Sequence, residues 1–122
     1  MAAPNIKSGS SVTTVTGKTV GYAVTTTNTA ALSNAANSGK VLKVNSVYCA
    51  NVNATAAADI SLDHFNGTTG YRLANSIAVP AKATQVLVTR EAYIYIEEGQ
   101  SLRALGGTAG DLELVISYEE IS

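Results

Sequence analysis

The fold is decided between residues 40 and 121, which read KVLKVNSVYCANV (40–52), ADISLDHF (58–65), YRLANSIAV (71–79), TQVLVT (84–89), YIYIEEG (93–99), SLRAL (101–105) and DLELVISYEEI (111–121). In each segment apolar and polar residues alternate, which is typical of a strand buried on one face. Gly, Pro, Asn or Asp residues separate the segments and indicate turns. Strands this closely spaced leave no room for crossover helices. The sequence therefore predicts an all-β, antiparallel protein.

The length of 122 residues fits one domain. We expect a flexible N-terminal arm at residues 1–10 and a β-sandwich of jelly-roll kind, with eight to ten short strands, at residues 11–122. Aromatic content is low, with six Tyr, one Phe and no Trp. A core of such small side chains favours closely spaced sheets and further burial in a homo-oligomer, for which we favour a trimer.

The segment before residue 40 is patterned less clearly. SVTTVTG (11–17) and KTVGYAVTTT (18–27) read as two strands broken at Gly17. In the second, the side opposite Tyr22 carries only Thr, Gly and Ala, and so flat a side suits close packing against another sheet or subunit. TNTAALSNAANSG (27–39) fits one helical turn or a surface loop equally well.

Strict alternation through residues 40–52 places Leu42, Val44 and Tyr48 on one face and Val47 and Cys49 on the other. Since the second face is only half polar, we expect this strand to be central and covered on both sides. A tight turn at NGTTG (66–70) should join the segments 58–65 and 71–79 as a hairpin, because Asn and Gly both tolerate positive φ.

Charge excludes several classes of function. Eight Lys and Arg oppose nine Asp and Glu, giving a formal net charge of −1. Nucleic-acid binding depends on a clustered positive patch, and the chain has none, so we expect no nucleic-acid partner.

The opening MAAPNIKSGSS (1–11) lacks the apolar core of a signal peptide, and no segment is long and apolar enough to span a membrane. We expect synthesis in a cytoplasm and no membrane partner.

Residues with catalytic or metal-binding chemistry are sparse. Cys49 is the one cysteine and alternates with apolar neighbours, so we expect it to pack as a small hydrophobe. His64 is the one histidine, and Asp63 beside it points to the other face of a strand, so the two cannot hold one ion together. Neither a nucleophile elbow nor a phosphate-binding loop is present. The sequence predicts no enzymatic activity, no metal and no cofactor.

Candidate contact residues are found instead. Tyr93 and Tyr95 share one side of a strand and suit contact with a sugar or a protein, although covering the second face of the sandwich is the role more often found for such a pair. Three arginines could pair with the C-terminal glutamates of a neighbouring subunit, and an apolar residue in the arm could clamp a neighbour. These candidates are Arg72, Arg90, Arg103, Glu119, Glu120 and Ile6.

Six segments carry a resemblance to a known family: MAAPNI (1–6), VTGKT (15–19), GKVLKVNS (39–46), EEGQSLR (97–103), GDLE (110–113) and SYEEI (117–121). Together they resemble small structural proteins of tailed phages, notably those of marine cyanobacteria. The likeness extends over nearly the whole chain and contains no catalytic motif. In this group an Asp is expected at the position of Gln100, and the departure argues against a metal-binding turn.

The resemblance implies a non-enzymatic virion protein, present in many copies and in contact with the major capsid protein or with tail proteins. The first hypothesis is a capsid-decorating or cementing subunit at a symmetry axis. The alternative is an adsorption or carbohydrate-binding module on the tail or fibres, with Tyr93 and Tyr95 as a stacking platform.

Overall fold

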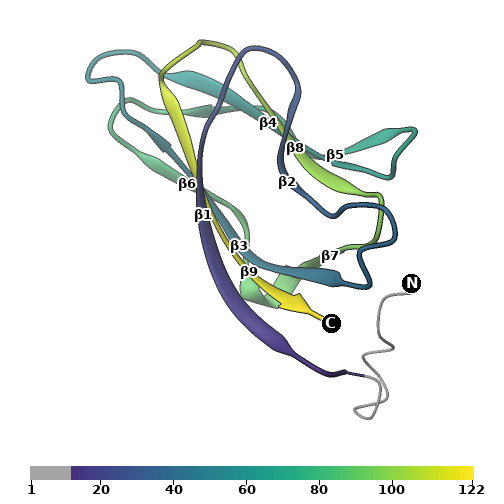
Figure 1. The fold of residues 1–122 in the computed structure, drawn as a ribbon. Helices are drawn as coiled ribbons and strands as arrows, with labels where there is room; N and C mark the ends of the chain where they lie inside the picture. The colour runs from purple at the N-terminus through teal and green to yellow at the C-terminus, as the bar shows by residue number, and fades with distance from the viewer. Residues whose placement is uncertain (1–11) are drawn as a thin grey trace.

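The computed structural model describes residues 12–122 and consists of two antiparallel β-sheets packed face to face (Figure 1). The arm expected at residues 1–10, with Ile6, lies outside the described residues. The elements are β1 (Val15–Ala23), β2 (Thr29–Ser33), β3 (Val41–Asn51), β4 (Ala58–Phe65), β5 (Gly70–Val79), β6 (Thr84–Val88), the short 3-10 helix η2 (Arg90–Ala92), β7 (Ile94–Ile96), β8 (Ser101–Gly106) and β9 (Leu112–Ile121).

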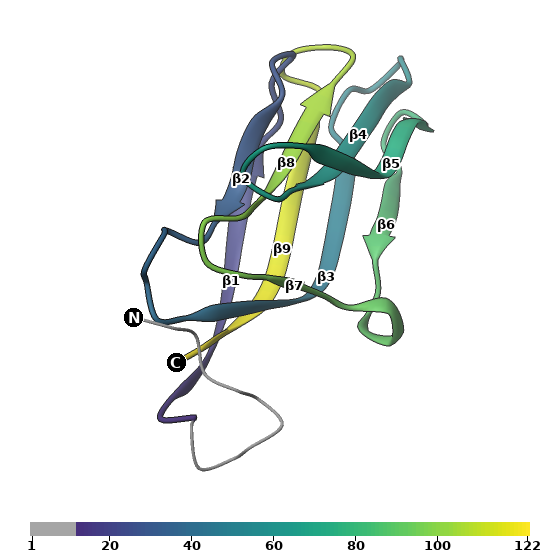
Figure 2. The ribbon, with the colours of Figure 1, turned by 90° about the vertical axis from the view of Figure 1, so that its right-hand side faces the viewer.

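Five strands form sheet A in the order β1-β9-β3-β6, with β7 paired to the first part of β3. Figure 2 shows β1, β9, β3 and β6 side by side. The other four strands form sheet B in the order β2-β8-β4-β5. Every strand pair is antiparallel, so the prediction of an antiparallel β-sandwich is confirmed. Its jelly-roll form stays a prediction.

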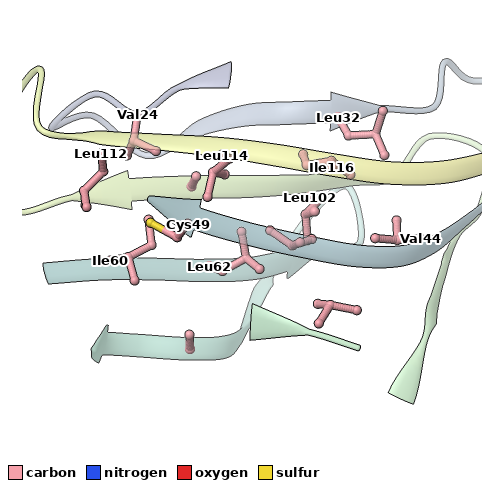
Figure 3. Close-up of a cluster of buried hydrophobic side chains, with 14 of the residues drawn as sticks. Val24, Leu32, Val44, Cys49, Ile60, Leu62, Leu102, Leu112, Leu114 and Ile116 are labelled. Carbon is pink, nitrogen blue, oxygen red and sulfur yellow. The ribbon is translucent and has the colours of Figure 1, made fainter. Parts of the chain in front are cut away.

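The core lies between the facing sides of the two sheets. Figure 3 shows the buried side chains of both sheets pointing into this space, among them Leu114, Ile116 and Leu62. All three are completely or almost completely buried. The alternation in the last predicted strand is borne out, because Leu112, Leu114 and Ile116 are buried while Glu113 and Val115 are exposed. The free energy that the fold gains by removing apolar surface from water therefore comes mainly from one side of each sheet.

A β-bulge in β3 corrects the faces expected from strict alternation. The register of β3 with β9 shifts between Val44 and Ser46, and Asn45 is the extra residue. Beyond the bulge the parity is reversed, so that Val47 and Cys49 lie in the core and Tyr48 is exposed. The expectation that Tyr48 shares a face with Leu42 is wrong. A bulge of this kind places two residues opposite one, and each later side chain of the strand then points to the other face.

Two further expectations are wrong before residue 40. β1 runs through Gly17 without a break, because Gly17 pairs with Glu119 in the ladder to β9. Residues 29–33 form the strand β2 rather than a helical turn or loop, because they pair with β8 and bury Leu32. In both places pairing with a distant strand outweighs weak local preference.

The predicted hairpin at residues 66–70 is confirmed, since β4 and β5 pair on either side of it. Gly67 has a φ of +98°, and the Asn66 side chain accepts hydrogen bonds from the backbone N–H groups of Thr68 and Thr69 at 2.9 and 2.8 Å. Further along β5 the ladder is irregular. Ser76 has a φ of +50°, and its N–H donates to Oγ of Ser61 at 2.9 Å.

Cys49 behaves as expected of a structural thiol. It is fully buried among the core residues. Burial raises the pKa of the Cys49 thiol to about 11, because a thiolate is poorly solvated there. The thiol is therefore neutral at physiological pH and contributes packing rather than chemistry.

The sandwich predicts unequal costs for two leucine truncations on neighbouring strands. Leu62 on β4 is fully buried, whereas Leu73 on β5 is 41% exposed. We expect Leu62→Ala to lower the free energy of unfolding by about 2–5 kcal/mol, because it leaves a cavity. Leu73→Ala, the matched control, should cost less than about 1 kcal/mol. Urea denaturation measures both, and equal costs would contradict this placement of the core.

Candidate functional site

The side of sheet A that faces away from the core, here called the outer face of sheet A, carries an organised set of solvent-facing side chains. Its residues form rows paired across β1, β9, β3 and then β7 or β6. Four rows are Gly17–Glu119–Lys43–Tyr95, Thr19–Ser117–Ser46, Gly21–Val115–Tyr48–Val86 and Ala23–Glu113–Ala50–Thr84.

The third row is apolar although it is exposed. Val115, Tyr48 and Val86 occupy adjacent strands and are 43%, 44% and 42% exposed. Tyr48 reaches this face only because the bulge at Asn45 reverses the parity of β3. Single exposed apolar residues are ordinary, but three in register across three strands make a continuous strip suited to contact with another molecule.

A hollow of about 500 Å³ lies beside this strip. It is lined by residues at and after the bulge of β3, by part of β9, by β6 and by the segment that includes η2. Its lining residues are Asn45, Ser46, Tyr48, Val86, Val88, Thr89, Arg90, Glu91, Ser117 and Glu119. Asn45 donates to Glu119 at 3.0 Å, which links the bulge to β9. Among the described residues, no side-chain hydrogen bond engages Ser46, Ser117 or Arg90, so these groups are available to a partner.

Tyr93 and Tyr95 lie at the β7 end of the same face and contact each other. Their ring centroids are 5.4 Å apart at an interplanar angle of 80°, an edge-to-face arrangement. The Lys43 ammonium lies 4.3 Å from the centroid of the Tyr93 ring. Burial, the neighbouring Tyr93 and the charge of Glu119 raise the pKa of Tyr95, so its hydroxyl stays protonated. This cluster joins β7 to β3 and is not two free stacking rings.

The glutamates at the end of β9 have partners within the chain. Glu119 is bonded to Asn45 and lies next to Lys43 in the β3–β9 register. Glu120 lies between two lysines, with Lys40 Nζ at 2.9 Å and Lys18 Nζ at 3.1 Å. Hydrogen bonds from Lys40 and Lys18 lower the pKa of Glu120 in spite of partial burial. Glu120 therefore links β1 and β9 to the start of β3.

On sheet B the side facing away from the core carries a buried ion pair. Arg103 donates from Nε and Nη2 to the two Asp63 oxygens, each at 2.9 Å, and its guanidinium lies 4.0 Å from the centroid of the Phe65 ring. Asn28 donates to Asp63 at 3.1 Å. The Asp63 side chain is only 3% exposed. A bidentate pair of this kind fixes the alignment of β4 with β8.

The pKa of Asp63 is set by opposing effects. Burial raises it, but hydrogen bonds from Arg103 and Asn28 and the charges of Arg103 and Arg72 outweigh burial, so the pKa lies below its usual value. Glycine is needed beside the pair. A Cβ added at Gly70 would lie 2.7 Å from Asp63 Oδ2 and would also meet the Arg103 guanidinium.

The predicted contact residues thus divide into two groups. Tyr93, Tyr95, Arg90 and Glu119 lie together on or beside the outer face of sheet A. Arg72 and Arg103 belong to sheet B, where both flank Asp63 in the register, and Arg103 is engaged within the chain. Pairing between these arginines and glutamates of another subunit stays a prediction. The sequence reading missed Lys43, Tyr48, Val86 and Val115, because only the register between distant strands brings them together.

His64 has a structural partner. Its Nε2 lies 3.0 Å from the Gln100 side-chain oxygen, which also accepts from the backbone N–H of Glu97 at 3.2 Å. Gln100 therefore fastens the turn before β8 to β4.

Within residues 12–122, no group of three His, Cys, Asp or Glu side chains is arranged to hold a metal ion. In the same part of the chain, no helix has the length and apolar character needed to cross a membrane.

Comparisons with family models, curated proteins and solved structures give no match to this chain.

The Asp63–Arg103 pair predicts a pH-dependent stability. Because the folded-state pKa of Asp63 is lowered, its carboxylate stabilises the fold above the unfolded pKa of about 3.9, and this contribution is lost as the pH falls through the folded-state value. We expect Asp63→Asn to cost about 3 kcal/mol at pH 7, since it leaves Arg103 without its charge partner. The cost should shrink steadily below about pH 4.

The matched control is Asp59→Asn, on the same strand but exposed, which should change stability by less than about 0.5 kcal/mol. Urea denaturation at a series of pH values measures all three proteins. A cost for Asp63→Asn that is the same at pH 7 and at pH 2.5 would contradict the assignment.

Proposed function

We propose that this chain is a non-enzymatic structural protein of a tailed-phage virion, in the first instance a capsid-decorating or cementing subunit whose outer face of sheet A contacts another protein subunit. The resemblance to small phage structural proteins supports the virion assignment. The observation that carries the contact role is the exposed apolar row of Val115, Tyr48 and Val86 across three paired strands. A rigid sheet that presents such a row suits a protein whose role is to hold subunits together.

We also propose that the sandwich is a jelly roll. Four antiparallel pairs are nested in the sequence, namely β1 with β9, β2 with β8, β3 with β6 and β4 with β5. The chain passes between the sheets at each step except the central β4–β5 hairpin and the step from β6 to β7. Nesting of this kind is what a long hairpin rolled into two sheets would give. Viral capsid and lectin domains use jelly rolls, and this support for a virion role is one of fold-level analogy.

The charge distribution fits contact with another protein subunit. The outer face of sheet A carries both signs, with Lys43, Glu113 and Glu119 spread over its rows. Mixed charge around an apolar strip is the ordinary composition of a protein–protein interface.

Copy number in purified virions tests the proposal. We expect the protein in the head fraction at on the order of hundreds of copies per particle, because a decorating subunit repeats with the symmetry of the shell. Quantitative mass spectrometry of separated heads and tails measures this. Absence from the virion, or presence in the tail alone, would contradict the decoration role.

The alternative is an adsorption or carbohydrate-binding module, and the hollow on sheet A favours it. Hydroxyl, amide and carboxylate groups line the hollow next to the exposed ring of Tyr48, a combination suited to a saccharide. The paired tyrosines are less suitable, because Lys43 lies against the Tyr93 ring and Tyr95 contacts Tyr93 edge to face.

For this alternative we expect binding on an array of defined glycans that Tyr48→Ala reduces at least tenfold, since the ring would supply the stacking surface. Tyr71→Ala, at an exposed tyrosine of sheet B, is the matched control and should bind as the unaltered protein does. Absence of binding to every glycan on the array would reject the alternative.

A further inference from the structure

We propose that a second copy of this chain covers the outer face of sheet A, related to the first by a twofold axis that runs parallel to the strands between β9 and β3. The proposal takes from the proposed function only the choice of this surface as the contact face. It adds the partner, the residues that meet and the symmetry of the contact, which is twofold and not the trimeric symmetry expected from the sequence.

Two glycines of β1 give the first indication. Gly17 and Gly21 pair with β9 on this face, and neither has a positive φ. A Cβ at Gly17 would meet nothing within 4 Å, and one at Gly21 would meet only the Leu114 carbonyl oxygen at 3.9 Å. The described chain therefore has room for side chains at both positions. Glycine inside a strand is destabilising, and it often marks a place where another backbone or ligand approaches closely.

The sizes of the side chains are complementary under the proposed rotation. The axis places β9 of one copy over β3 of the other, and β1 of one copy over the opposite edge of the other sheet. Each row keeps its position along the strand direction, so that it faces the same row of the second copy. Gly17 therefore lies opposite Tyr95 of the second copy, which is the other end of its own row. In the same way Gly21 lies opposite Val86 of the second copy. A hollow of about 280 Å³ beside Gly21 and Val115 lies where that Val86 side chain would arrive.

The charges are complementary under the same rotation. Glu119 on β9 and Lys43 on β3 are paired neighbours in one row, on either side of the axis. Rotation places Glu119 of each copy against Lys43 of the other, which gives two equivalent intersubunit ion pairs. On the other levels Ser117 meets Ser46, Val115 meets Tyr48, and Glu113, at the margin of the contact, meets Ala50. An isologous interface requires this reciprocity, in which residue i meets j and j meets i.

The available area suits a dimer. With strands about 4.8 Å apart and about 3.3 Å per residue, the four columns of this face measure roughly 20 by 30 Å. The projected area is thus roughly 600 Å² per copy, which is of the same order as the ~800 Å² per partner buried in a standard interface. Sheets packed face to face with aligned strands keep their directions within about 30°, so the rows of the two copies stay close to opposite each other.

The reciprocity favours a second copy over an unrelated partner. A different protein could cover the apolar row, but it would not require small residues at one edge to match large residues at the other edge of the same chain.

The first test substitutes a glycine. We expect the purified protein to sediment as a dimer at high micromolar concentration and Gly21→Val to weaken self-association at least tenfold. In the monomer the new side chain has room, and valine favours strands, so urea denaturation at concentrations where both proteins are monomeric should show equal or greater stability. A dimer unaffected by Gly21→Val would overturn the proposal, as would a monomer or a trimer of the unaltered protein.

The second test reverses charges. Lys43→Glu and Glu119→Lys should each weaken the homodimer, because each places like charges across the axis. Mixing the two single variants should restore a dimer, since both cross-axis pairs are then of opposite sign. Asp59→Lys, on the exposed side of sheet B, is the control and should leave self-association unchanged. Failure of the mixed variants to associate would overturn the twofold arrangement.

These outcomes are independent of where the protein resides. Self-association is measured on the purified chain, whereas the decoration role is measured by copy number in virions. If the protein is a dimer but is absent from virions, only the proposed function is contradicted. If it is monomeric but abundant on heads, only the twofold contact is contradicted.

Discussion

The pairing of β3 with β9 is the constraint on which the rest of the structure depends. β9 is bonded to β1 on one side and to β3 on the other, and β3 also holds β6 and β7. The bulge at Asn45 interrupts this ladder once and determines which side of β3 is buried. Without the extra residue, Val47 and Cys49 would face outward and Tyr48 would enter the core. The buried side of β3 beyond the bulge and the place of Tyr48 in the apolar row and in the lining of the hollow follow from that one inserted residue.

Much of the architecture was predictable from local pattern. The alternation in 111–121 gave the correct buried side for β9, and the Asn66-Gly67 pair gave the β4–β5 hairpin. The parity of β3 was not predictable, because nothing in Val44-Asn45-Ser46 distinguishes a bulge from continued pairing. β2 was missed for a related reason, since its Ala-rich residues become a strand only when β8 is present to pair with them.

The candidate site was predictable only in part. Tyr93 and Tyr95 were recognised as neighbours because they are two residues apart on one strand. Lys43, Tyr48, Val86 and Val115 could not be grouped, since their proximity depends on the register of strands far apart in the sequence. The same limitation hid the Asp63–Arg103 pair, whose members are 40 residues apart and whose contact removes Arg103 from the set of free surface charges.

The two outward sides of the sandwich consequently differ in kind. On sheet B the buried Asp63 carboxylate is satisfied within the chain, by Arg103 and Asn28. Sheet A leaves an apolar row and a hollow exposed to solvent. Ser76 gives this contrast a further meaning. Its positive φ and its bond to Ser61 interrupt β5, the strand at the margin of sheet B. An interrupted margin is a poor template for an incoming strand, so growth of the sheet into fibrils is discouraged there.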